Sequence, residues 1–193
     1  MKAKKVLVIG GTGHIGSYLV PLLVSRNYEV TVFSRGTTRP YPGSIVWKKI
    51  NQIKIDRERD EKNGNWQERI SNLEPDIIVD LICFEPDSAQ IMAETIDQED
   101  IHLLTCGTTW IYGKTCIIPT PETAPRNPQN DYAQKKADIE KTLPMVIISL
   151  YKTINSFVQK NDLFCTKENN LLYKIFLIFL FVSKKHSESL KND

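Results

Sequence analysis

The sequence predicts an α/β fold built on a doubly wound parallel sheet. Three observations carry this prediction. Apolar, β-branched runs alternate with helical patterns along the first 150 residues. The first run is purely apolar at Val6–Ile9, which is typical of a parallel strand buried on both faces. A glycine-rich turn separates the first strand from the first helix, as in a mononucleotide-binding half.

Composition limits the classes of protein that remain. The chain has 193 residues, of which 41% are hydrophobic and 25% charged. These values exclude whole-chain disorder and collagen-like repeats, and they suit one globular domain. The formal net charge is only +2, so we expect neither nucleic-acid nor membrane binding. Basic residues are concentrated in residues 1–50, which favours an anionic ligand there.

The first β-α-β unit is the clearest part of the pattern. Lys4–Ile9 reads as a buried strand, Gly10–Gly16 as a turn and Glu29–Phe33 as the second strand. Between them lies a helix, in which we expect a kink at Pro21 because proline removes a backbone donor. The apolar positions of that helix share one face and are Ile15, Leu19, Leu22 and Leu23.

The later elements follow the same alternation. Strands are expected at Ile45–Ile55, Asp76–Ile82, Ile101–Cys106 and Met145–Leu150. Helices are expected at Asn65–Leu73, at Asp87–Ile96 with Asp87 as its cap, and at Asp131–Leu143, the last after a proline-rich loop at Pro119–Pro128.

The chain changes character after Leu150. Residues 1–150 are expected to form the domain, and residues 151–193 an atypical tail that contains neither glycine nor proline. The apolar run Ile175–Val182 is too short for a membrane span, so a buried helix or strand, or a poorly folded tail, is expected there. The opening residues lack the apolar core of a signal peptide.

The cysteines indicate a reducing compartment. Their spacing matches no zinc motif, so we expect no metal site, free thiols and a cytoplasmic protein. The four are Cys83, Cys106, Cys116 and Cys165.

The glycine turn predicts a dinucleotide site. Gly10 permits the tight turn, Gly13 lets a pyrophosphate approach the backbone, and Gly16 lets the helix pack closely. The helix then opens at His14 and Ile15 and presents free N–H groups and a partial positive charge to phosphate. A merely structural turn is the alternative, but the strand–turn–helix context favours nucleotide binding.

The end of the second strand favours NADP over NAD. A carboxylate there would bind the ribose 2′-hydroxyl of NAD, but this chain has Arg35, with Arg39 nearby. A guanidinium suits a 2′-phosphate. The alternative is an ordinary solvated surface arginine.

A tyrosine and a lysine lie on one face of the last predicted helix. Tyr132 and Lys136 are four residues apart. A neighbouring ammonium favours phenolate, so we expect Tyr132 to exchange a proton with substrate. Thr108, at the end of the fifth strand, would orient the reacting oxygen. By themselves, these residues also fit an amphipathic helix start and a strand-end turn.

Taken together, these residues resemble the extended short-chain dehydrogenase/reductases of the NAD-dependent epimerase/dehydratase type, from about Lys2 to Leu150. The matching segments are GGTGHIG at Gly10–Gly16, Asp80–Cys83, Thr108–Gly113 and Tyr132–Lys136. The resemblance implies a Rossmann fold with NADP or NAD as cofactor. The cofactor-binding residues that it implies are Gly10, Gly13, Gly16 and Arg35, with Asp56 near the adenine and Cys83 near the nicotinamide ribose. It also implies catalysis by Thr108, Tyr132 and Lys136.

Two departures from the family pattern stand out. The usual serine pair before the catalytic hydroxyl is replaced by Cys106 and Gly107. Only 43 residues follow Leu150, so we expect the substrate-binding C-terminal region to be largely missing, as in a truncated product.

Three functions are compatible with this pattern. The first is an NAD(P)-dependent oxidoreductase or epimerase acting by hydride transfer on a small, polar, sugar-like substrate. The second is a dinucleotide-binding module or remnant without catalysis. The third, RNA binding as in the chloroplast stem-loop binding proteins, is disfavoured by the near-neutral charge. By resemblance, a homodimer would form through the helices at Asp87–Ile96 and Asp131–Leu143.

Overall fold

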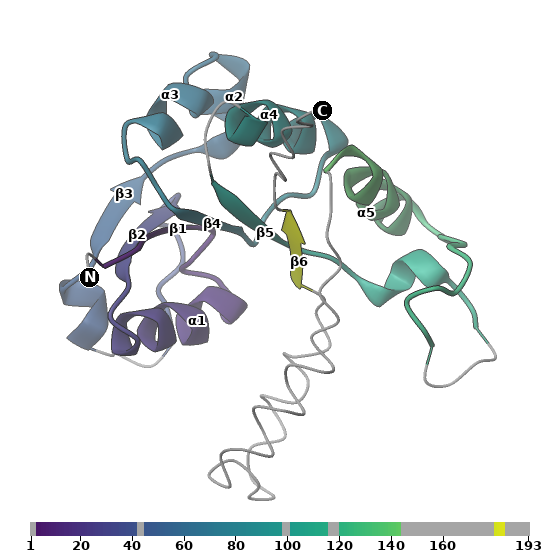
Figure 1. Cartoon of the computed structure of the whole chain (residues 1–193), viewed down its shortest axis with the longest axis horizontal. Coiled ribbons are helices and arrows are strands. Elements are labelled where there is room, and N and C mark those ends of the chain that lie inside the picture. The colour runs from purple at the N-terminus through teal and green to yellow at the C-terminus, as the bar shows by residue number, and fades with distance from the viewer. Residues whose placement is uncertain (1–2, 42–44, 98–100, 116–119, 144–179, 184–193) are drawn as a thin grey trace, which may run out of the picture.

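The fold is a twisted sheet with helices on both faces (Figure 1). The computed structural model describes residues 3–41, 45–97, 101–115, 120–143 and 180–183. The strands lie in the order β3-β2-β1-β4-β5-β6. Their bounds are β1 (Lys5–Ile9), β2 (Glu29–Ser34), β3 (Asn51–Lys54), β4 (Ile77–Asp80), β5 (His102–Cys106) and β6 (Leu180–Ser183).

Five of these strands are parallel and confirm the predicted sheet. β6 comes from the tail and pairs antiparallel with β5, with Leu104 opposite Val182. The apolar run Ile175–Val182 therefore contributes to an edge strand of the sheet. The predicted strand Met145–Leu150 lies outside the described residues.

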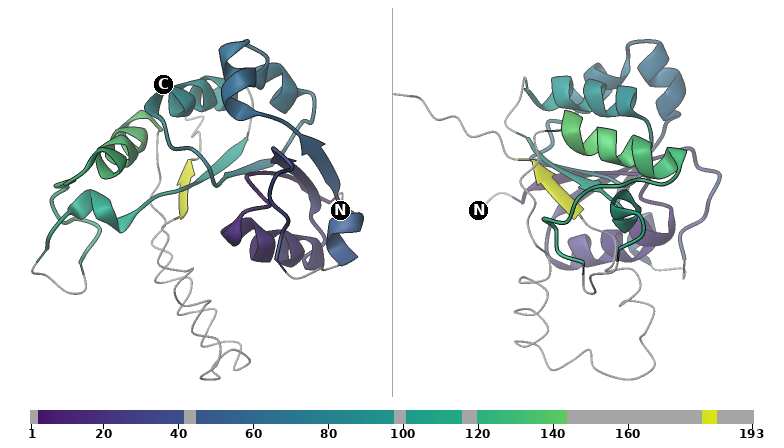
Figure 2. Two further views of the ribbon diagram at one scale, coloured as in Figure 1. Left: turned by 180° about the vertical axis from the view of Figure 1, so that it is seen from behind. Right: turned by 90° about the vertical axis from the view of Figure 1, so that its right-hand side faces the viewer.

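The helices divide between the two faces of the sheet, as Figures 1 and 2 show. α1 (His14–Ser25) covers one face. α2 (Arg57–Lys62), α3 (Trp66–Ser71), α4 (Pro86–Asp97) and α5 (Asp131–Thr142) lie on the other. Two 3₁₀ turns, η1 (Ile45–Lys48) and η2 (Thr109–Tyr112), complete the set of described elements.

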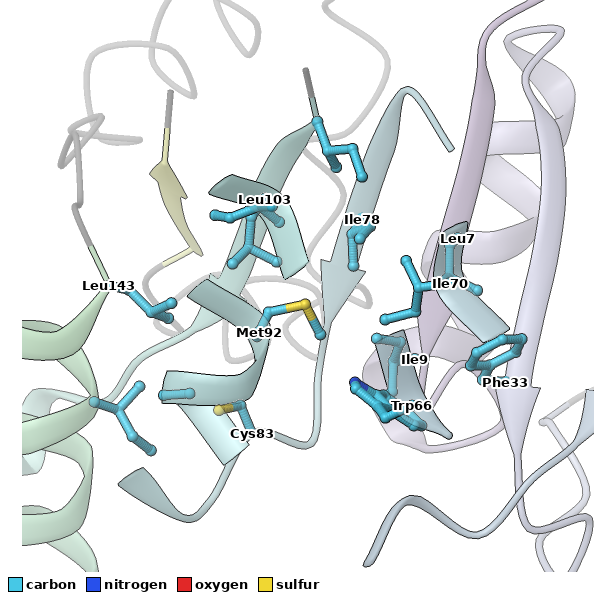
Figure 3. Packing of buried hydrophobic residues seen from close by; sticks show 14 of the residues in the cluster. Leu7, Ile9, Phe33, Trp66, Ile70, Ile78, Cys83, Met92, Leu103 and Leu143 are labelled. Carbon is cyan, nitrogen blue, oxygen red and sulfur yellow. The ribbon is translucent and has the colours of Figure 1, made fainter. Parts of the chain in front are cut away.

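β1 is buried on both faces, as its apolar sequence predicts. Leu7 and Ile9 point into the core beneath α3 and α4, together with Met92 and Trp66 (Figure 3). Val6 and Val8 enter the opposite core under α1. Because β1 lies between β2 and β4, the sheet reverses its winding beside it, and ligands bind such sheets at the carboxyl ends next to this point.

Two local predictions were wrong, and one helix was missed. Ile45–Ile55 is not one strand, because η1 buries Trp47 and the strand begins only at Asn51. α2 was missed because its sequence, RERDEK, carries no apolar periodicity. Asp87 is not a cap but lies in the first turn of α4, which begins at Pro86. Proline suits the first helical position because its missing N–H would have no partner there.

Gly16 sets how closely α1 approaches the end of β1. A Cβ at this position would overlap the carbonyl oxygen of Gly11. The partner is backbone, so no side chain can move aside. The close packing predicted for this glycine is therefore confirmed.

A Gly16→Ala substitution should destabilise the protein by about 2–3 kcal/mol, because the added methyl group must push α1 off the turn. The same exchange in an ordinary helix interior stabilises by roughly 0.5–1 kcal/mol. Denaturant unfolding measures the difference. Gly13→Ala is the matched control, since its Cβ would meet only Gly10 O, at 3.3 Å. A Gly16→Ala variant as stable as wild type would show that α1 can shift freely.

Candidate functional site

The turn after β1 leaves the start of α1 open to a ligand. Gly10 adopts a φ of +78°, and the Gly13 amide donates to the Gly10 carbonyl at 3.1 Å. Gly13 caps α1 without a side chain, and no acidic residue lies in the first turn. His14 and Ile15 open the helix. The first-turn amides and the helix dipole therefore meet no carboxylate of their own turn, which suits an anion.

An aromatic cluster beside this turn was not predicted. The His14 ring lies 5.9 Å from that of Tyr18 and 5.3 Å from that of Tyr41. The Tyr41 amide donates to Ser17 Oγ at 3.0 Å, so the chain after β2 folds back on the start of α1. The spacing of 23 residues between Tyr18 and Tyr41 gives no periodic signal that could have revealed the contact.

Arg35 and Asp56 lie at the same edge of the sheet. Arg35 directly follows β2 and is exposed. Asp56 follows β3, and its carboxylate accepts a hydrogen bond from the Arg59 amide at 3.2 Å, capping α2. The two strands pair in parallel up to Ser34 and Lys54. The structure thus gives Asp56 a capping role. Its place near the adenine stays a prediction.

Lys136 is buried at the carboxyl ends of β4 and β5. Its ammonium donates to the carbonyls of Cys83 at 2.7 Å and Cys106 at 2.9 Å. The Phe84 ring centroid lies 4.9 Å from Nζ. The residue is only 3% exposed, and burial lowers the pKa of Lys136. These carbonyls supply the polar partners that a buried ammonium requires.

Tyr132 lies on the same helix and faces solvent, with 42% of its surface exposed. Its ring meets Trp110 edge to face at 6.0 Å. Burial and the nearby Cys106 raise the pKa of Tyr132, and a side-chain hydrogen bond with Thr108 opposes the rise. The structure thus brings Thr108 and Tyr132 together. The expected lowering of this pKa by Lys136 is not found. The ammonium instead donates to the carbonyls of Cys83 and Cys106.

Cys83 contributes its backbone carbonyl to the site, as the acceptor for Lys136, and not its thiol. The side chain is buried, and burial raises the pKa of its thiol to about 12. It therefore remains protonated at neutral pH. Cys83 and Cys106 are both free.

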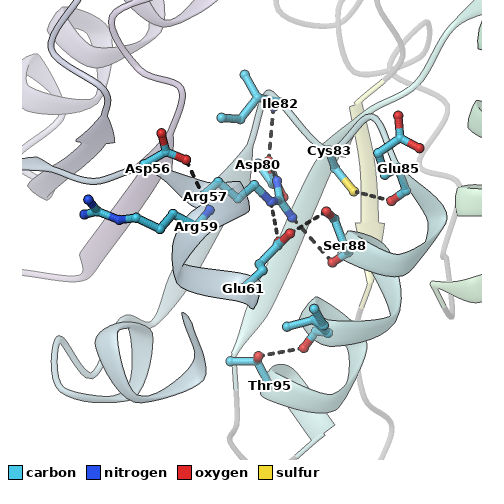
Figure 4. A network of polar contacts seen from close by, with 11 residues as sticks. Asp56, Arg57, Arg59, Glu61, Asp80, Ile82, Cys83, Glu85, Ser88 and Thr95 are labelled. Atoms are coloured by element: carbon cyan, nitrogen blue, oxygen red, sulfur yellow. Dashed lines mark hydrogen bonds and ion pairs between the residues drawn. The ribbon is translucent and has the colours of Figure 1, made fainter. Parts of the chain in front are cut away.

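A buried charge network lies behind the site and was also missed (Figure 4). The Arg57 guanidinium donates to both carboxylate oxygens of Asp80, at 3.0 and 2.8 Å, and to Glu61 at 2.6 Å. Burial opposes the charge on Arg57, but the Asp80 and Glu61 carboxylates outweigh it, so the pKa of the guanidinium is raised. The sequence signal was Asp80, a charged residue that interrupts the apolar run Ile77–Cys83.

Two classes of site are not found in the described part of the chain. It contains no cluster of His, Cys, Asp and Glu residues fit to hold a metal ion. Among the same residues, no helix is long and apolar enough to cross a membrane.

Glu140 is the third ionisable side chain on the face of α5 that carries Tyr132 and Lys136. Its carboxylate lies 2.6 Å from the Arg126 guanidinium. Burial nevertheless raises the pKa of Glu140 to about 7, against the opposing charges of Arg126 and Lys136. The folded state therefore holds a proton here that the unfolded state releases at lower pH.

Stability should fall as pH rises from about 4.5 to 7, since over that range the folded protein binds more protons than the unfolded chain. At about 1.4 kcal/mol per pKa unit, the ceiling is about 3 kcal/mol. Unfolding of a Glu140→Gln variant across this range should lack the slope. Asp138→Asn on the same helix is the control and should retain it. An unchanged slope in Glu140→Gln would disprove the assignment.

Comparisons with known proteins identify the family and the fold. The family model described as the NAD dependent epimerase/dehydratase family matches residues 6–144. The 2'-dehydrokanamycin reductase of Streptomyces kanamyceticus is 23% identical over 139 residues, which are 72% of this chain and 37% of that protein. The chloroplast stem-loop binding protein of 41 kDa b of Arabidopsis thaliana is 26% identical over 142 residues, covering 68% of this chain and 36% of that protein.

The solved structures show the same fold. UDP-glucose 4-epimerase from Brucella ovis, in complex with NAD, superposes with a TM-score of 0.60 at 19% identity, covering 73% of this chain and 47% of that one. The chain thus spans about half of this structure and little more than a third of the two curated relatives. It belongs to the NAD dependent epimerase/dehydratase family, as its motifs predicted.

Proposed function

We propose that this chain binds NADP or NAD along the carboxyl edge of β1, β2 and β4 and carries out reductase- or epimerase-type chemistry on a small, polar, sugar-like substrate. The observation that carries the proposal is the start of α1, held against a turn of glycines at the point where the sheet reverses its winding. The names of a matched sugar epimerase in complex with NAD and of a 2'-dehydrokanamycin reductase support the same chemistry.

The residues at this edge fit a dinucleotide. Above the turn, a Cβ on Gly13 would meet only the Gly10 carbonyl, so the backbone is accessible to a diphosphate. Gly10, Gly13, Gly16, His14 and Ile15 would hold it through the turn and the first helical amides.

Residues on either side of the turn would hold the two ends of the cofactor. Arg35 would meet a 2′-phosphate, and Asp56 would lie near the adenine. Cys83 and Lys136 would face the nicotinamide ribose. When bound, the cofactor supplies hydride transfer.

Tyr132 and Thr108 would handle the substrate oxygen. Because its pKa is raised, the phenol keeps its proton at neutral pH and can donate it to a carbonyl oxygen. The Thr108 hydroxyl, hydrogen-bonded to Tyr132, would orient that oxygen. Lys136 would hold its positive charge behind the pair, fastened to the carbonyls of Cys83 and Cys106.

A Tyr132→Phe substitution should leave dinucleotide affinity within about twofold and lower turnover by about 10²–10⁴-fold, the usual share of general acid catalysis. Titration with NADPH and NADH measures the first, and reduction of a panel of keto sugars the second. Tyr28→Phe, before β2 at the opposite edge, is the matched control. Turnover that survives in Tyr132→Phe would disprove the proton role, and a wild-type chain that binds neither dinucleotide would disprove the site.

An Arg35→Ala substitution should weaken NADPH by at least tenfold and NADH by less than threefold. The variant loses a charge-assisted contact of about 1.5–3 kcal/mol that only the 2′-phosphate can make. Arg26→Ala, at the far end of α1, controls for the loss of one positive charge. Equal losses for both dinucleotides would place Arg35 away from the 2′-phosphate.

A further inference from the structure

The Arg57–Asp80 pair controls the backbone as well as its own charges. Asp80 is the last residue of β4 and is 0% exposed. Besides its two bonds from Arg57, its Oδ1 accepts a hydrogen bond from the Ile82 amide at 3.1 Å. One carboxylate therefore holds the guanidinium and fixes the direction in which the chain leaves the strand (Figure 4).

The same network reaches the start of α4. Arg57 Nη2 donates to the Ser88 carbonyl at 3.4 Å, and Ser88 Oγ donates to Glu61 Oε2 at 2.7 Å. The connection between β4 and α4 is thus tied at both ends to residues of α2. We call this connection, Leu81–Glu85, the β4–α4 segment.

The β4–α4 segment contacts both halves of the candidate site. Ile82 packs beneath the glycine turn, where a Cβ on Gly10 would lie 2.5 Å from Ile82 Cγ2. One residue further along, the Cys83 carbonyl accepts from Lys136 at 2.7 Å. A shift in this short segment would therefore move the support of the glycine turn and one of the two carbonyls that hold the ammonium.

Net stabilisation does not by itself account for this pair. A buried ion pair often contributes little compared with apolar side chains of similar volume, because both charges lose their hydration. What the network does impose is geometry, because three nitrogens of Arg57 each have their own partner. Nη1 donates to both Asp80 oxygens, Nε to Glu61, and Nη2 to the Ser88 carbonyl, so the guanidinium has one orientation. The geometry here leads to the backbone of the β4–α4 segment.

We propose that Arg57 and Asp80 are positioning residues, whose ion pair fixes the β4–α4 segment and, through the Cys83 carbonyl, the ammonium of Lys136. The inference rests on the proposed function, because it concerns the nicotinamide end of the dinucleotide site. Arg57 and Asp80 would contact neither substrate nor cofactor. Their ion pair would nevertheless selectively affect binding of the nicotinamide end.

The test compares Asp80→Leu, which removes the acceptor, with Asp80→Asn, which retains an oxygen for the Ile82 amide. All variants are made in the full chain. The matched control is Asp60→Leu, since Asp60 is equally buried and pairs with Arg69 at 3.2 Å in α2 and α3. If Asp80→Leu fails to fold, Arg57→Lys takes its place. Lysine keeps the charge, but its one nitrogen cannot bind Asp80, Glu61 and the Ser88 carbonyl at once.

Two measurements separate positioning from general stability. Amide hydrogen exchange compares Ile82 with Val8 in β1 and needs no ligand. Nucleotide titration compares NADH with ADP, which lacks the nicotinamide half. We expect Asp80→Leu to speed exchange at Ile82 at least tenfold beyond any change at Val8, and to weaken NADH at least tenfold relative to ADP. Asp80→Asn should show clearly smaller effects, and Asp60→Leu neither selective effect.

Two results would overturn the proposal and leave the pair a general stabilising role. One is equal acceleration of amide hydrogen exchange at Ile82 and Val8 in Asp80→Leu, and the other is an unchanged ratio of NADH to ADP affinity. Failure of the proposed function looks different. In that case the wild-type chain binds neither nucleotide, and the exchange comparison alone then supports or overturns the positioning of the β4–α4 segment.

Discussion

The close approach of α1 to the end of β1 is the constraint on which the rest of the site depends. Gly16 lies against the Gly11 backbone without room for a methyl group, and this contact determines where the first amides of α1 point. Neighbouring parts are built around the same turn. Ile82 supports it from the β4–α4 segment, and the chain near Tyr41 folds back on Ser17.

Charges at the carboxyl edge are held by geometry as well as by attraction. The Lys136 ammonium is satisfied by two backbone carbonyls, that of Cys83 in the β4–α4 segment and that of Cys106 at the end of β5. It therefore links this segment and β5 to α5. The Asp80 carboxylate is satisfied by Arg57 and by one amide of the chain. Both groups are buried, and a buried charge without such partners would be costly. The backbone at this edge is therefore defined by side chains from distant elements.

Elements with a strong local pattern could be predicted from the sequence. β1, α1, β2 and α5 have the expected positions because apolar periodicity, the glycine turn and the Asn130 cap act within a few residues. α2 was missed because it has no apolar face of its own, although Asp56 is a recognisable cap. The chain between Ile45 and Ile55 was misread because Trp47 gains its burial from α1 and β2, which local pattern does not reveal.

By itself, the sequence determined the α/β class and the identity of the glycine turn, because the strand and helix patterns and the turn glycines are local features of the chain. Only the tertiary structure decided how the polar groups are paired. Arg57 meets Asp80 across 23 residues, and Lys136 meets the Cys83 carbonyl across 53. Such partners are brought together by the packing of helices on the sheet, so their choice depends on the whole fold rather than on any local pattern.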